Sequence, residues 1–183
     1  MKPNIRIALA VVALALAGIS RAHPAAGDTP PDFLGHDRHG ADVRVSGFHG
    51  KVVIVSFWAS WCSYCLKEMP ILAAIQKKVG PEQLQVVGVN HNDDLDTFRK
   101  IRYRWKDLDV ILTYESADNS ISRPYGIKGL PYMVMIGRDG RIAYIHVGYG
   151  EDELNGILAE LQDLLDAPAP APGAAVAGAA GGA

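Results

Sequence analysis

The sequence has no excess of basic residues: 18 Lys and Arg face 20 Asp and Glu, and the net charge is −2. A nucleic-acid-binding surface is rich in positive charge, so this balance argues against nucleic acid as a partner. Internal repeats are also absent. The composition is otherwise ordinary, with 49% hydrophobic and 21% charged residues, and 183 residues suffice for one domain with a sizeable core.

Cysteine is scarce as well. The only two cysteines, Cys62 and Cys65, lie three positions apart. A bridge between them would close a very short loop. Because the chain-entropy stabilisation from a disulfide grows with loop length, such a bridge would add little stability. The pair is therefore better explained by reactivity than as an inert structural bridge, which stays the alternative.

A long apolar run is lacking too. Residues 7–19 are rich in Ala, Leu and Val and follow Lys2 and Arg6, but about 20 residues are needed to span a membrane. With the small residues at 20–22 (Ser-Arg-Ala), this is typical of a cleaved signal peptide. We expect residues 1–22 to be removed and the protein to reach the periplasm. An uncleaved N-terminal membrane anchor stays open, whereas the lack of a nearby cysteine argues against a lipid-modified N-terminus.

The two ends of the remaining chain have a biased composition. Residues 23–31, rich in Pro and Ala, are interpreted as a flexible lead-in. Residues 167–183 are almost entirely Ala, Pro and Gly, which predicts a disordered tail. The folded domain is therefore expected at residues 32–166.

Strands and helices alternate within that domain. The predicted strands are 33–34 and 42–45, forming a hairpin around 37–40, then 51–58, 84–90, 110–114, 132–136 and 142–147. The predicted helices are 62–79, 95–105, 117–125 and 154–165. Pro70 should kink the first of these helices. This order predicts an α/β fold: a mixed central sheet flanked by helices, with a short N-terminal β-hairpin.

Cys62 begins the helix that follows a buried strand. Free backbone N–H groups and the helix dipole favour an anion there, so we expect the pKa of the Cys62 thiol to be lowered. Cys65, one turn later, is placed to attack a mixed disulfide formed by Cys62. A zinc site would need two histidines in addition. None of the five candidates is paired at metal-ligand spacing near the cysteines: His36, His39, His49, His91 and His146. We expect these histidines to be solvated.

Several motifs in order resemble one family. Residues 55–65 (Val-Ser-Phe-Trp-Ala-Ser-Trp-Cys-Ser-Tyr-Cys) are similar to the active-site strand and loop of thioredoxins. Residues 66–70 (Leu-Lys-Glu-Met-Pro) and the loop 125–132 (Tyr-Gly-Ile-Lys-Gly-Leu-Pro-Tyr) resemble the TlpA-like (ResA/CcmG-type) extracytoplasmic thioredoxins. The hairpin that follows, 138–142 with Gly148, is also similar. The likeness covers nearly all of residues 32–166.

This resemblance implies a thioredoxin fold and an exported thiol:disulfide oxidoreductase. Such a protein would reduce disulfides in extracytoplasmic client proteins, such as apocytochrome c during cytochrome c maturation or copper-site assembly proteins. It would need no cofactor and no metal, act as a monomer, and receive electrons from a membrane donor of the DsbD/CcdA type.

The resemblance also implies a substrate-binding surface. It places a cis peptide bond between Leu130 and Pro131, facing the disulfide, where the Leu130 backbone is free to pair with a client strand. Trp61, Ser63 and Tyr64 complete the predicted substrate-binding residues around the sulfur atoms.

Glu68 is the third candidate catalytic residue beside the two cysteines. It lies three residues after Cys65 and shares a helix face with it. Similar proteins of the ResA type use a glutamate at this spacing, which implies that Glu68 deprotonates Cys65. A solvated helix glutamate is the alternative.

The chain departs from the family pattern at three places. Ser63-Tyr64 lacks the proline common before the second cysteine, Tyr132 replaces a usual threonine, and Ser56 occupies the position of thioredoxin's buried aspartate. These departures affect substrate and redox potential, so a DsbA-like disulfide oxidant stays open. A copper-binding or metal-delivery module that uses the same cysteines and a histidine also stays open, since soft thiolates suit copper(I). A peroxiredoxin is excluded because Val55 and Ala59 occupy its required Pro and Thr positions.

Overall fold

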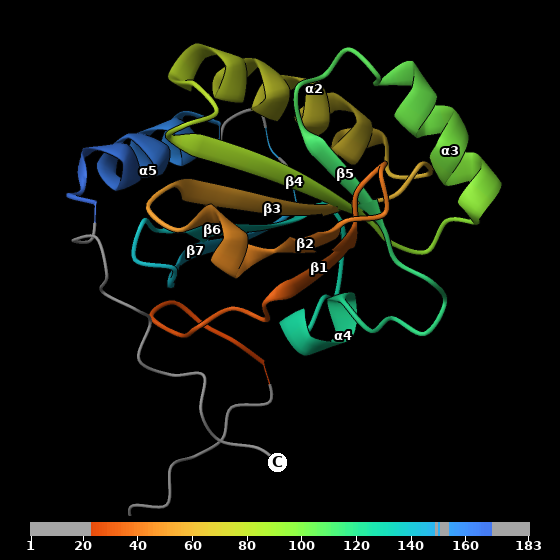
Figure 1. Cartoon of the computed structure of the whole chain (residues 1–183), viewed down its shortest axis with the longest axis horizontal. Helices are drawn as coiled ribbons and strands as arrows, with labels where there is room; N and C mark the ends of the chain where they lie inside the picture. Colours follow the sequence, from red (N-terminus) through yellow and green to blue (C-terminus); the bar gives the residue numbers. More distant parts are fainter. Residues whose placement is uncertain (1–22, 149, 151–153, 170–183) are drawn as a thin grey trace, which may run out of the picture.

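The computed structural model describes residues 23–148, 150 and 154–169 (Figure 1). The expected signal peptide, 1–22, and most of the expected tail, 170–183, lie outside these residues. The strands are β1 (Phe33–His36), β2 (Asp42–Arg44), β3 (Val52–Trp58), β4 (Leu84–Asn90), β5 (Ile111–Tyr114), β6 (Tyr132–Ile136) and β7 (Ile142–Val147). The helices are the 3-10 helix η1 (Val45–Phe48) and the α-helices α2 (Ser63–Val79), α3 (Leu95–Arg104), α4 (Ser122–Tyr125) and α5 (Leu154–Asp166).

The central sheet has five strands in the order β5-β4-β3-β6-β7. β3 pairs in parallel with β4, and β4 with β5, whereas β6 is antiparallel to both β3 and β7. β3 lies in the middle and every one of its residues is buried, as expected for a strand covered on both faces. The predicted mixed sheet is confirmed, and so is the separate hairpin of β1 and β2.

The two faces of the sheet carry two hydrophobic clusters. Alternate residues of β3 point to opposite faces: Ile54 and Trp58 pack against α2, α3 and α5, while Val55 and Phe57 pack against the hairpin and α4. The three long helices accordingly cover one face of the sheet (Figure 1). Both cysteines belong to the cluster on the helical face. Among the described residues, no helix combines the length and apolarity needed to cross a membrane.

The helix predicted at 117–125 is shorter in the structure, where α4 spans only Ser122–Tyr125. Asn119 has a positive φ of 54°, which an α-helix does not accommodate. Asp118 holds the preceding turn by accepting hydrogen bonds from the Ser116 hydroxyl and the Ser120 N–H. The helix begins where the buried Glu115 carboxylate accepts the N–H groups of residues 121 and 122.

Residues 23–31 form no regular element, yet they contact the domain. The N–H of Gly27 donates to the Ile142 carbonyl at 2.8 Å, and the N–H of Ile142 donates to the Asp28 carbonyl at 3.0 Å. The Tyr125 hydroxyl donates to the Pro31 carbonyl at 2.7 Å. These contacts, which the composition of the segment did not predict, extend the packed chain to the N-terminal side of residue 32.

Candidate active site

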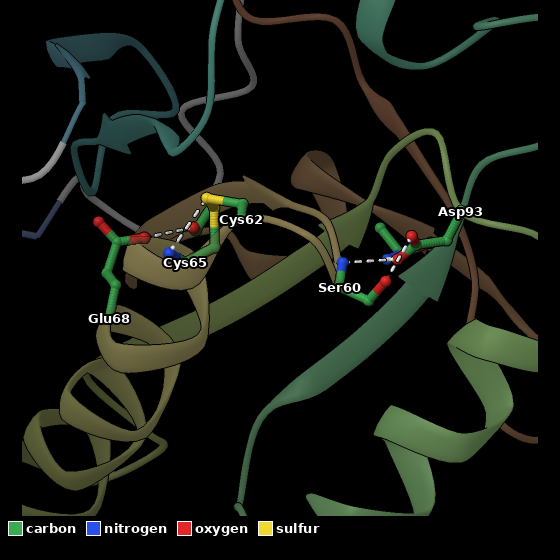
Figure 2. The surroundings of a disulfide bond; sticks show 7 residues. Ser60, Cys62, Cys65, Glu68 and Asp93 are labelled. Carbon is green, nitrogen blue, oxygen red and sulfur yellow. Dashed lines mark hydrogen bonds between the residues drawn. A yellow bond between two sulfur atoms is a disulfide. The ribbon is translucent and has the colours of Figure 1, made fainter.

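Cys62 and Cys65 form a disulfide at the N-terminal end of α2 (Figure 2). Cys62 is the N-cap residue, and its sulfur accepts a hydrogen bond from the Cys65 N–H at 3.2 Å. In the reduced protein this N–H and the helix dipole would stabilise a thiolate on Cys62. Cys62 is 7% exposed and Cys65 is fully buried. Cys62 is therefore the sulfur that another protein reaches first.

The residues beside Cys62 are exposed. Trp61 is 64% exposed and Tyr64 is 53% exposed, and Ser63 between the cysteines is also exposed. The Lys67 ammonium lies 5.7 Å from the centre of the Tyr64 ring. Large exposed aromatic rings beside a buried sulfur offer an apolar contact surface. That this surface binds a client remains a prediction.

The Leu130–Pro131 peptide bond is cis, as the resemblance implied. Pro131 is buried, and half-buried Leu130 packs against the hydrophobic cluster that contains both cysteines. The Pro131 carbonyl accepts a hydrogen bond from the Gly148 N–H at 2.8 Å, just beyond the end of β7. The structure thus brings the loop and the cysteines to the same cluster, and the pairing of Leu130 with a client strand stays a prediction.

Glu68 lies one turn beyond Cys65 in α2 and is only 2% exposed. The Ser56 hydroxyl, from the facing strand β3, donates a hydrogen bond to its Oε2 at 2.8 Å. Its Oε1 is buried and has no hydrogen-bond partner among the described residues. The alternative of a solvated helix glutamate is therefore wrong: Ser56, at thioredoxin's aspartate position, holds a carboxyl group that comes from the helix instead.

Burial sets the acidity of this carboxyl group. Loss of solvation raises the pKa of Glu68 to about 7, although the Ser56 hydrogen bond and the charge of His146 act in the lowering direction. A group with this pKa both takes up and releases a proton near neutral pH. That Glu68 accepts the proton of Cys65 when that thiol attacks stays a prediction.

Two histidines are less solvated than expected. His146 lies directly across from Met133, which lies across from Ser56, so the three residues form one row over β7, β6 and β3. The Nε2 of His146 lies 2.6 Å from the Glu160 carboxylate of α5, with 21% of the His146 side chain exposed. His91, whose side chain is 17% exposed, pairs with Glu115 at 2.9 Å.

Asp93, between β4 and α3, was not predicted as a site residue from the sequence. Its carboxylate accepts hydrogen bonds from the N–H and hydroxyl of Ser60, two residues before Cys62 (Figure 2). The available signal was its position: it closely follows the carboxyl end of a buried parallel strand, where sites of α/β proteins gather.

Among the residues that the structure describes, no group of three or more His, Cys, Asp or Glu side chains is arranged to hold a metal ion.

The fold and the site together define a thiol-disulfide oxidoreductase of the thioredoxin class. A Cys-x-x-Cys pair begins a helix directly after the central strand of a mixed five-stranded sheet, and a buried carboxyl group lies one turn below it. A crystal structure from Chlorobium tepidum, assigned as the thiol:disulfide interchange protein DsbE, has the same fold. It superposes with a TM-score of 0.68 at 27% identity, covering 78% of this chain and 99% of that chain.

Comparison of sequences leads to the same class. The Redoxin family matches residues 25–161. The thiol-disulfide oxidoreductase ResA of Geobacillus thermodenitrificans is 27% identical over 124 residues, which cover 68% of this chain and 70% of that protein. The thioredoxin-like protein YneN of Bacillus subtilis is 29% identical over 122 residues, covering 67% and 71% respectively. The chain belongs to the Redoxin family, and its resemblance to the ResA/CcmG type is confirmed.

Proposed function

We propose that this protein reduces disulfides in client proteins outside the cytoplasm. The observation that carries the proposal is the buried carboxyl group of Glu68, held by Ser56 one turn below a Cys62–Cys65 pair at a helix N-terminus. Such a site supplies both a stabilised attacking thiolate and a proton acceptor for the second thiol.

The reaction proceeds in two exchanges. The Cys62 thiolate attacks a client disulfide, forming a mixed disulfide and releasing one client sulfur as a thiolate, which takes up a proton. Glu68 then accepts the proton of Cys65, whose thiolate attacks the Cys62 sulfur. The second client thiol is released and the Cys62–Cys65 disulfide remains. Two electrons have passed from the protein to the client.

Export and processing form part of this proposal. Removal of residues 1–22 as a signal peptide would leave His23 at the start of the mature chain, followed by the domain at 32–166 and the tail at 167–183. N-terminal sequencing of the extracytoplasmic protein should find His23 first. An intact Met1 would instead favour a retained membrane anchor.

The proposed partners follow from the TlpA-like resemblance. Each turnover leaves the protein oxidised, so a membrane dithiol donor of the DsbD/CcdA type would restore the reduced form. Apocytochrome c, in cytochrome c maturation, and copper-site assembly proteins are the proposed clients. We propose that the protein acts on them as a monomer.

The test is to trap the mixed disulfide. Cys65→Ser removes the resolving thiol, so this variant should accumulate adducts with client proteins that mass spectrometry identifies. Cys62→Ser is the matched control, because it keeps one thiol but removes the attacker, and it should trap nothing. Equal trapping by both variants would contradict the assigned roles. Metal analysis of the purified reduced protein separates this function from a copper-binding one, which would retain copper.

A further inference from the structure

Asp93 accepts three hydrogen bonds beside the active-site loop. Its Oδ2 accepts the Ser60 N–H at 2.7 Å and the Asn90 side-chain amide at 2.7 Å, and its Oδ1 accepts the Ser60 hydroxyl at 2.8 Å. Figure 2 shows the two bonds to Ser60 on the side of the loop away from the disulfide. A carboxylate with three donors is a strong, geometrically defined anchor.

The anchor itself is held by neighbouring strands. Asn90, which donates to the carboxylate, is the last residue of β4 and is fully buried. The Tyr114 hydroxyl, at the end of β5, donates to the Asp93 backbone carbonyl at 3.2 Å. The His91 N–H donates to the Trp58 carbonyl at the end of β3 at 2.8 Å. Asp93 therefore projects from a rigid edge of the parallel strands.

Ser60 lies in the short connection between β3 and α2, two residues before Cys62. Other backbone bonds hold this connection, including Cys62 N–H to the Ala59 carbonyl at 3.2 Å. The disulfide also holds Cys62 against the helix, but only in the oxidised state. Once the disulfide opens, fewer contacts keep Cys62 at the N-terminus of α2. The hydrogen bonds that Ser60 donates to Asp93 then contribute more to its position.

We propose that Asp93 is a positioning residue for Cys62. By accepting the hydrogen bonds of Ser60, Asp93 holds the reduced Cys62 sulfur against the free N–H groups of α2 and so maintains the reactive thiolate. The inference rests on the thiol-disulfide exchange proposed above and adds a residue to it. Asp93 touches neither the reacting sulfur nor the client, and acts through the loop.

The direction in which the pKa of the Cys62 thiol moves distinguishes a positioning role of Asp93 from a simple effect of its charge. Removing a negative charge near a thiol lowers the thiol pKa, because the thiolate loses a repulsive neighbour. Releasing the loop from the helix N-terminus raises it, because the thiolate loses its donors. A purely structural Asp93 would alter the free energy of unfolding and leave the Cys62 thiol unchanged.

The experiment compares Asp93 with its neighbour Asp94. Asp94 caps α3 by accepting the N–H and hydroxyl of Thr97 at 2.9 and 2.7 Å. Within the described part of the chain, no hydrogen bond joins Asp94 to the active-site loop. Asp93→Ala and Asp94→Ala therefore remove the same charge one position apart. Thiolate absorbance against pH reports the pKa of Cys62 in the reduced protein, and attack on 5,5′-dithiobis(2-nitrobenzoate) reports its reactivity.

Asp93→Ala should raise the pKa of Cys62 and slow its attack at neutral pH about tenfold, since small displacements of a reacting group cost this much or more. Asp94→Ala should leave the pKa of Cys62 unchanged and its rate of attack within about twofold of the wild-type rate. A pKa that falls, stays unchanged or moves equally in the two variants would overturn the inference. Should Asp93→Ala fail to fold by circular dichroism, Ser60→Ala gives the same readout with a smaller change, because it removes the hydroxyl that donates to Asp93 and leaves the charge in place.

Ser60→Ala and Asp93→Ala should also be non-additive, because they break the same contact. Additive shifts in the Cys62 pKa would contradict the proposed route through Ser60. The two proposals fail separately. If the wild-type protein does not reduce protein disulfides but Asp93→Ala raises the Cys62 pKa, only the proposed function fails. If the wild-type protein reduces them and Asp93→Ala matches it in pKa and rate, only the positioning role fails.

Discussion

The Ser56 hydroxyl donates a hydrogen bond to the Glu68 carboxyl group across 2.8 Å inside the protein core. The two residues come from β3 and α2, and both are almost fully buried. The strand thus supplies the donor and the helix supplies the acid, one turn below Cys65.

Glu68→Gln should slow the resolution of mixed disulfides about 100-fold at neutral pH, within the range typical of a lost general base. The amide retains the shape of the side chain but does not accept the Cys65 proton. Quenched-flow measurement with a disulfide peptide would show a mixed disulfide that persists. Glu82→Gln is the control, because Glu82 is exposed. Resolution at the wild-type rate in Glu68→Gln would return Glu68 to a structural role.

Glu68→Gln should also change how stability depends on pH. Burial raises the folded-state pKa of Glu68 from 4.5 to about 7, so the folded protein binds more protons than the unfolded chain between these values. Its contribution to stability is therefore full below about pH 4.5 and is lost as pH rises through about 7. The loss amounts to about 3 kcal/mol, at about 1.36 kcal/mol per pKa unit.

Urea denaturation of the oxidised wild-type and Glu68→Gln proteins at a series of pH values tests this. The free energy of unfolding of the variant, relative to the wild type, should rise between about pH 4.5 and 7 and be level outside that range. Other carboxylates titrate in both proteins and cancel in the difference. A difference that stays constant with pH would show that the pKa of Glu68 is not raised.

Ser56→Ala should raise the pKa of Glu68 further, since it removes the hydrogen bond that acts in the lowering direction. The pH midpoint of mixed-disulfide resolution should therefore shift to more alkaline values, while the first attack by Cys62 should change little. Ser60→Ala is not a suitable control, because Ser60 bonds to Asp93. Ser46→Ala, at an exposed serine remote in sequence from the cysteines, is suitable. An unshifted or acid-shifted midpoint would contradict the role of Ser56.

The redox potential should lie nearer thioredoxin's, roughly −270 mV, than DsbA's, roughly −120 mV. Ser63 and Tyr64 supply no cation between the cysteines, so the Cys62 thiolate is stabilised mainly by the helix terminus. The gap between the two cases corresponds to about 7 kcal/mol. Equilibrium titration with glutathione measures the midpoint. A value above about −150 mV would make the protein a DsbA-like oxidant.

Local patterns were sufficient to predict most of the fold. The apolar run of β3, the helical spacing of α2 and α5 and the turn between β6 and β7 all depend on residues close together in the chain, and the structure has each of them. The placement of Cys62 at a helix N-terminus was predicted in the same way. These features follow from hydrophobic periodicity and from turn residues, and both can be recognised within a short stretch of sequence.

Contacts between residues far apart in the sequence could not be predicted from such local patterns. Glu68 has the spacing of a surface glutamate as much as of a buried acid, and only the packing of α2 over Ser56 removes it from water and raises its pKa. Asp93 and Ser60 are 33 positions apart, and they meet because β3 and β4 run in parallel and end at the same edge. Burial and long-range hydrogen bonds depend on which surfaces the folded chain brings together. For that reason the placement of Cys62 and Cys65 at the start of a helix could be predicted from the sequence. The burial of the Glu68 carboxyl group and the hydrogen bonds that Ser60 donates to Asp93 required the three-dimensional structure.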